Sequence, residues 1–275
     1  MGEGIANIVI WCMTKLTDIF SDLELVETLK IGDVFGFTGV KTIWDLIKGF
    51  AMGLIMVYFM WEMNSKWAFE GNDLNMKSLA GPFCKVIFAI ILFNNAETIA
   101  TGMTNFYNSC VDKGAAVAAV TTPDMTNLQE QLESLGIMAA VVILLPMLLV
   151  VLISYVLKFS FIYKALMIKF EFLFRVGFTP LAMADSFNGL NSNSMRWIKG
   201  FVGYGVYVAA FLLIPNIGMG IMDKYMIDVS TAATTGEGLD FILQVLERIV
   251  MVVAVPFAEL GVIGAIKQLS KEAAG

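Results

Sequence analysis

The stretch GIMAAVVILLPMLLVVLISYVL at residues 136–157 decides the fold class of this chain. It carries no charged residue, and about 20 apolar residues in a helix are enough to cross the ~30 Å hydrocarbon core of a membrane. The whole chain has the same character, since 58% of its 275 residues are hydrophobic and only 15% are charged. A soluble domain is much less apolar. The sequence therefore predicts an all-α, polytopic membrane protein.

Five stretches are apolar and long enough to be transmembrane helices. They lie near residues 43–63, 82–102, 136–157, 200–222 and 242–264. The second is the weakest, because FNNAETIA makes its second half polar, and such a span is expected to face protein or water rather than lipid. We therefore expect residues 43–275 to form a transmembrane domain.

Residues 1–42 are predicted to form a separate, extracytoplasmic segment. Between residues 4 and 30, apolar side chains recur at helical spacing, with charged residues between them. The apolar members of this pattern are Ile5, Ile8, Val9, Cys12, Leu16 and Ile19. Such an amphipathic helix either lies on the outer membrane surface or makes an assembly contact. The sequence leaves both interpretations open.

The distribution of lysine and arginine predicts the orientation, because positively charged loops stay in the cytoplasm. Residues 103–135 carry Lys113 as their single cation among several acidic residues. Residues 158–199 instead contain the cations Lys158, Lys164, Lys169, Arg175, Arg196 and Lys199. We therefore expect membrane lipids as partners, the N-terminus outside and the C-terminus in the cytoplasm.

Residue usage excludes several classes of chemistry. The chain has no histidine, and its cysteines Cys12, Cys84 and Cys110 form no CxxC pair. This excludes a zinc site with histidine ligands, a Ser-His-Asp triad and a Cys-His dyad. The sequence also lacks a glycine-rich phosphate loop. We expect no enzyme activity, no cofactor and no metal.

Charged residues inside the apolar stretches are the candidates for function, because burying a charge in a membrane is costly. Glu97 lies in the polar half of the second stretch, and Glu259 lies past Pro256 in the last. Each of these two acids is a candidate for lining a substrate path. For Glu97 the alternative is that it ends its helix early. Glu247 and Arg248 are close enough to the outer interface to reach water.

Glycines predict where helices pack closely. Gly49 and Gly53 are one helical turn apart, Gly200 and Gly203 are similarly spaced, and Gly218 lies near the end of the same stretch. Small residues at this spacing let helix backbones approach each other. The pattern is common in membrane bundles and predicts packing rather than a particular function.

The third apolar stretch continues through KFSFIYKALMIKFEFLFRVG to residue 177. A helix of ~40 residues would be ~60 Å long, twice the hydrocarbon core, so it either projects into the cytoplasm or bends along the inner leaflet. Residues 178–187 are a second, short apolar piece, and NGLNSNS at 188–194 supplies turn formers. With Ser194 as a helix cap and Trp197 as an interface anchor, this segment predicts a hairpin that enters the membrane from the cytoplasmic side.

In this order of features the chain resembles the TrbL-like conjugal-transfer membrane proteins. Its amino-acid sequence is similar to that of their shorter Gram-positive members. The resemblance is carried by a long helix with a basic end, GFTPLAMADSF at 177–187, a polar turn, a Trp-containing helix start and a Gly-rich span, over about residues 136–264. It is a pattern of residue types and is less specific than a metal or phosphate motif. The residues that it picks out are Arg175, Pro180, Asp185, Trp197 and Lys199.

The resemblance implies a channel subunit of a type IV secretion system, which passes DNA or protein across the bacterial cytoplasmic membrane. It also implies a homo-oligomer, a pentamer by analogy, that works with an ATPase, a coupling protein and a DNA–protein substrate. Arg175, Arg196 and Lys199 then either meet DNA phosphates or only fix the orientation. The alternative is a secondary transporter or small-solute channel that uses intramembrane acids, although such folds usually contain internal repeats, which this sequence does not show.

Overall fold

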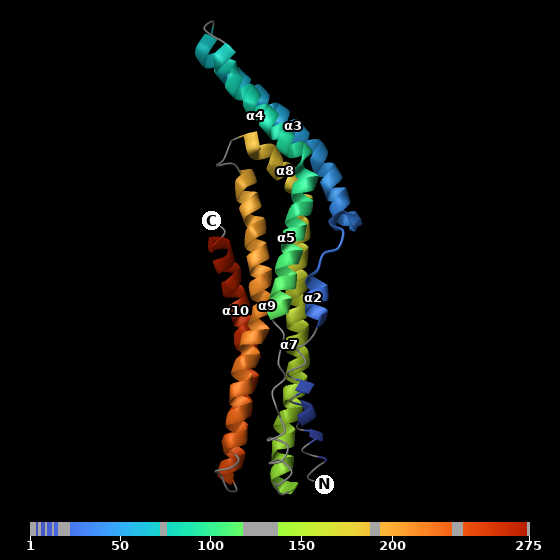
Figure 1. Ribbon diagram of the computed structural model, residues 1–275, viewed down its shortest axis with the longest axis vertical. Helices are drawn as coiled ribbons and strands as arrows, with labels where there is room; N and C mark the ends of the chain where they lie inside the picture. The colour runs from blue at the N-terminus through green and yellow to red at the C-terminus, as the bar shows by residue number, and fades with distance from the viewer. Residues whose placement is uncertain are drawn as a thin grey trace. The chain divides into compact units, whose positions relative to one another are not determined.

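The computed structural model describes residues 23–71, 76–117, 137–187, 193–232 and 239–273, together with residues 4, 7, 8, 10–12, 14 and 15. Within these residues every regular element is helical (Figure 1). The elements are α2 (Leu23–Leu29), the 3-10 helix η1 (Val34–Gly36), α3 (Thr38–Glu70), α4 (Met76–Asn94), α5 (Ala96–Val117), α7 (Ile137–Gly177), α8 (Thr179–Ala184), α9 (Asn193–Ala232) and α10 (Leu239–Ala273). The predicted all-α fold is confirmed.

Five of the described helices are long and apolar enough to cross a membrane. The candidate spans are Thr38–Phe69, Met76–Asn94, Leu144–Gly177, Ser194–Met222 and Leu246–Ser270. The prediction of a polytopic membrane protein with five apolar helices is confirmed. The first, fourth and fifth spans overlap their predicted stretches closely, whereas the third begins and ends later than its predicted range, 136–157, and the second begins and ends earlier.

The second span lies earlier in the chain than its predicted range, 82–102. Its helix ends at Asn94 and a new helix begins at Ala96, so the predicted range falls on two helices. At the junction, the side-chain nitrogen of Asn95 donates a hydrogen bond to the Ile91 carbonyl oxygen at 2.8 Å. The backbone nitrogen of Asn95 donates a hydrogen bond to the same oxygen at 3.1 Å, so the Ile91 carbonyl accepts from both groups.

The predicted long third helix is confirmed as α7. Its 41 residues correspond to about 62 Å of helix, about twice the hydrocarbon thickness. It ends at Gly177, and α8 follows with Pro180 in its first turn, where the fixed backbone angle of proline suits a helix start. The predicted short apolar piece is present as α8 and a 3-10 turn that reaches Phe187. The predicted turn at 188–192 lies outside the described residues, and α9 begins one residue before the predicted cap, Ser194.

The N-terminal segment is described only in part. The described residues up to position 15 are helical, residues 16–22 lie outside the described chain, and α2 follows. Next along the chain, the Asn108 side chain on α5 accepts a hydrogen bond from the Ile31 backbone nitrogen at 3.0 Å and donates one to the Ile31 carbonyl oxygen at 2.6 Å. These two bonds fix the segment that leads into η1 and α3. The choice between a membrane-surface helix and an assembly contact stays open.

The loop predicted outside the membrane at residues 103–135 begins as helix, because α5 continues to Val117. Residues 118–136 lie outside the described chain.

The chain divides into two compact units. We call residues 30–110, 167–207 and 269–275 the aromatic unit, and residues 1–29, 111–166 and 208–268 the groove unit. In the aromatic unit, α3 and α4 lie side by side (Figure 1), and both pack against α8. Small side chains in this core let the helices approach closely. The core consists of Ala51, Ile55, Val86, Ala89, Phe93, Ala184 and Phe187.

In the groove unit, α9 contacts both α5 and α7. The rings of Phe161 on α7 and Phe211 on α9 have centroids 6.1 Å apart. Gly114, near the end of α5, packs tightly on α9, since a Cβ at this position would lie 3.1 Å from Cδ1 of Leu212. α9 also forms a groove with α10, and the buried acid Glu259 lines this groove.

Candidate functional site

The first of two candidate ionisable residues is Arg175, which is half-buried in the last turn of α7 within the aromatic unit. Its guanidinium carbon lies 4.8 Å from the ring centroid of Trp197, 5.0 Å from that of Tyr204 and 5.8 Å from that of Phe201. All three rings belong to α9. A cation over an aromatic face gains about 0.5 to 2 kcal/mol, depending on how far it is removed from water. Arg175 therefore fastens the end of α7 to the start of α9.

A carboxylate belongs to the same cluster. Glu171 precedes Arg175 by one helical turn, and the Tyr204 hydroxyl donates a hydrogen bond to its Oε2. Residues four apart are neighbours on a helix surface, so the acid and the base share one side of α7. Nη1 of Arg175 is buried and has no hydrogen-bond partner among the described residues. The aromatic rings and the nearby carboxylate compensate this charge.

Two small residues complete the Arg175 cluster. A Cβ at Gly200 would overlap Nη1 of Arg175, so glycine is what lets the guanidinium approach the backbone of α9. The Thr179 hydroxyl donates a hydrogen bond to the Arg175 carbonyl oxygen at 3.2 Å and accepts one from Nε1 of Trp197 at 3.4 Å. The cluster thus joins the end of α7, the start of α8 and the start of α9.

The other residues picked out by the resemblance lie around this cluster. Pro180 is buried in the first turn of α8, and Asp185 follows the end of that helix. Asp185 and Trp197 both line a cavity of about 440 Å³. Arg196 and Lys199 are exposed on α9. The structure therefore separates the predicted cations into one that is enclosed by aromatic rings and two that face outward from their helix.

The remaining predicted residues have different surroundings. Glu97 is exposed in the first turn of α5, where a carboxylate interacts favourably with the helix N-terminus, so it begins a helix. A Cβ at Gly49 or Gly53 would meet no atom of the described chain within 4 Å. Close packing at these two positions would require another molecule and stays a prediction. Gly203 is buried on α9.

Four members of the Arg175 cluster were not identified from the sequence: Glu171, Thr179, Phe201 and Tyr204. A signal for three of them exists in the spacing. Glu171 lies four residues before Arg175, and the two aromatic residues lie four and seven residues after Trp197, which places each set on one helix face. Which helix would face which could not be read from that spacing.

Tyr107 on α5 is a further buried polar residue of the aromatic unit. Its ring centroid lies 4.3 Å from that of Phe172, and its hydroxyl has no hydrogen-bond partner among the described residues. Burial raises the pKa of this phenol above its usual value, so it stays neutral at physiological pH. It is a packing residue rather than an acid or base.

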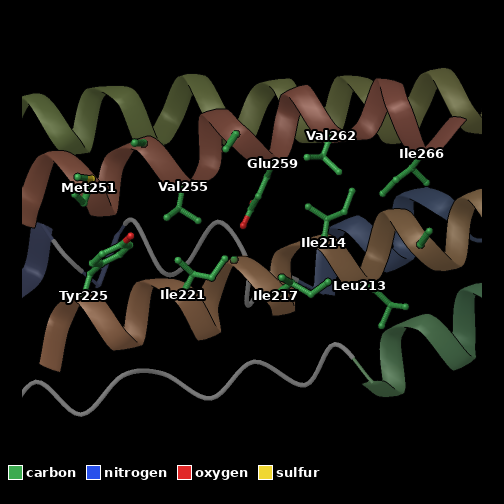
Figure 2. Close-up of a pocket in the computed structure, with 14 residues that line it drawn as sticks. Leu213, Ile214, Ile217, Ile221, Tyr225, Met251, Val255, Glu259, Val262 and Ile266 are labelled. Atoms are coloured by element: carbon green, nitrogen blue, oxygen red, sulfur yellow. The ribbon is translucent and has the colours of Figure 1, made fainter. Parts of the chain in front are cut away.

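The second ionisable residue is Glu259, a buried acid near the middle of the span Leu246–Ser270 in the groove unit. It is 6% exposed, and neither carboxyl oxygen has a hydrogen-bond partner among the described residues. Figure 2 shows its side chain extending from α10 toward α9. A Cβ at Gly218 would overlap Oε1, so this glycine of α9 leaves the space that the carboxyl group fills.

The Glu259 carboxyl group lines a groove of about 500 Å³ between α9 and α10. Aliphatic side chains such as Ile214, Ile217 and Val262 form most of its wall (Figure 2). Apart from Glu259, the side-chain heteroatoms in the wall are the hydroxyl of Tyr225 and the sulfur of a methionine. A volume of roughly 300–1,000 Å³ with few polar groups is typical of small-molecule sites. The groove therefore combines an apolar wall with one acidic group.

No family model, curated protein or solved structure matches this chain. Function is accordingly inferred from the residues and their geometry.

Proposed function

We propose that this chain is a non-catalytic channel or scaffold subunit of a type IV secretion machine, which passes DNA or protein across the bacterial cytoplasmic membrane. The observation that carries the proposal is the Arg175 cluster. Arg175 and Trp197 both come from the stretch that resembles the TrbL-like proteins, and they contact each other at the junction where α8 begins with Pro180. Contact between two residues that the resemblance picks out supports a shared structural role for them.

The helix lengths and the apolar surface also support a scaffold. α7, α9 and α10 have 41, 40 and 35 residues, more than the ~20 that a membrane crossing needs. Large apolar side chains are exposed on α3, including Trp61 at 74% and Phe69 at 90%. In a membrane, such surface is covered by lipid or by neighbouring subunits. A homo-oligomer, pentameric by analogy, would cover part of it and would work with an ATPase and a coupling protein.

The proposed orientation, with the C-terminus in the cytoplasm, rests on the distribution of cations. Arg196 is exposed, so a cysteine placed at this position can be labelled to test the orientation. In a chain whose Cys12, Cys84 and Cys110 are replaced by serine, Arg196→Cys should resist a membrane-impermeant thiol reagent in intact cells and react once the cells are opened. Labelling in intact cells would place this segment outside and overturn the orientation.

Deleting the gene in its host and restoring it from a plasmid tests the secretion role. We expect DNA transfer between cells to be lost in the deletion strain and restored by the wild-type chain. Normal transfer in the deletion strain would remove the proposal.

A small-solute channel or secondary transporter is the second candidate, and Glu259 favours it because buried intramembrane acids often mark ion and substrate paths. Purified protein in liposomes should then take up a labelled solute without any other component. Solute uptake by the chain alone, with normal DNA transfer in the deletion strain, would favour this candidate over the secretion role.

A further inference from the structure

We propose that the groove between α9 and α10 binds an organic cation with an apolar body, whose positive charge pairs with the carboxyl group of Glu259. The site would be a small-molecule site within the groove unit. It does not depend on whether the chain serves secretion.

The carboxyl group requires a partner that the described chain does not supply. Both oxygens of Glu259 are buried and unpaired among the described residues. An isolated charge in an apolar environment costs several kcal/mol, and a bound cation offsets that cost. The carboxyl group therefore selects a ligand that is positively charged.

Gly218 keeps the carboxyl group available to a ligand. Any side chain at this position would occupy the space of Oε1, which would push the acid away from α9. With glycine there, the acid reaches into the space between the helices (Figure 2). The pair Gly218 and Glu259 thus sets the position of the charge along the groove.

The groove wall indicates an organic ligand rather than a metal ion. Calcium takes about 6–8 oxygen ligands, and magnesium requires near-octahedral oxygen coordination. The part of the chain that the structure describes contains no group of three or more His, Cys, Asp or Glu residues that could hold a metal. A cation with its own hydrocarbon body matches both the single acid and the aliphatic wall.

A lipid fits the groove less well than an organic cation. An acyl chain would match the aliphatic wall, but it would leave the Glu259 carboxyl group without a partner. A phosphate head group would bring a second negative charge toward it. Glu259 also lies near the middle of its span, whereas lipid head groups lie at the membrane surface.

The experiment measures saturable binding of radiolabelled tetraphenylphosphonium to the full-length protein in nanodiscs, with empty nanodiscs as background. Tetraphenylborate has the same shape and the opposite charge. We expect the wild-type protein to bind the cation saturably and not the anion. Equal saturable binding of both ions would show a groove without charge selection and would overturn the proposal. This comparison uses the wild-type chain alone, so it stays decisive if a variant fails to fold.

Two matched variants locate the site. Glu259→Gln keeps the shape and removes the charge, and it should weaken cation binding by about tenfold or more. Glu247→Gln removes an exposed acid from the same helix and should leave binding unchanged. Equal affinity in Glu259→Gln and wild type would overturn the proposal.

A second copy of the chain is the other possible occupant of the groove. If the wild-type protein binds neither ion, the proposal fails. A smaller oligomeric mass in Glu259→Gln than in wild type would then identify the second copy as the occupant.

Discussion

Arg175, which is half-buried, and Glu259, which is buried, are two ionisable residues with opposite surroundings. Arg175 lies among three aromatic rings with a carboxylate nearby, whereas Glu259 has no hydrogen-bond partner among the described residues. A glycine of α9 makes room for each, Gly200 for the arginine and Gly218 for the acid. A compensated charge stabilises the junction that it joins, and an uncompensated one lowers stability. From this difference we infer that Arg175 is suited to holding helices together and Glu259 to binding a ligand.

Replacing Arg175 should have the largest effect on the free energy of unfolding. Arg175→Met keeps an apolar side chain but removes the interactions with three rings and leaves Glu171 without its neighbouring cation. We expect the free energy of unfolding to fall by about 3 kcal/mol in an equilibrium SDS titration. Arg175→Lys should restore little of it, because an ammonium group does not stack on the rings as a planar guanidinium does. Unchanged stability in Arg175→Met would show that the cluster does not hold the junction together.

Replacing Glu259 should change the free energy of unfolding in the opposite direction. Glu259→Leu places hydrocarbon in an aliphatic groove and removes a buried carboxyl group that has no partner among the described residues. We expect the free energy of unfolding to rise by about 2 kcal/mol in the same titration. A loss of stability in this variant would mean that Glu259 is already compensated, and the contrast with Arg175 would disappear.

The two glycines should respond differently to the same substitution. In Gly200→Ala the new methyl group displaces a guanidinium that is held by three rings, and we expect a loss of about 1 kcal/mol. In Gly218→Ala it displaces a carboxyl group that has no hydrogen bond to lose, so stability should change little. Gly49→Ala is the control without a collision, and it should gain up to about 1 kcal/mol from the higher helix propensity of alanine. Equal losses at positions 200 and 218 would contradict the comparison.

The smallest effect on stability is expected at the exposed cations. Arg196→Gln and Lys199→Gln should each change the free energy of unfolding by no more than about 0.5 kcal/mol. If these side chains meet DNA phosphates, the double variant should reduce DNA transfer while it inserts and assembles normally. Unchanged transfer would leave them only a role in orientation.

Sequence alone determined the class of the protein, its five apolar helices and the long α7. These properties depend on local hydropathy and helix length, which can be read along the chain. The second span was misplaced because average hydropathy does not show that one helix ends at Asn94 and the next begins at Ala96.

Tertiary structure alone decided which residues surround Arg175 and which surround Glu259. The sequence marked Glu259 as an intramembrane acid and Gly218 as a packing residue, but it did not pair them, because they lie on different helices and 41 positions apart. It likewise did not place Arg175 among Trp197, Phe201 and Tyr204. Such pairs depend on the rotation and crossing of whole helices, which many distant side chains set together. For this reason the chain's charges could be found from its sequence, while whether each is compensated could be seen only in the folded protein.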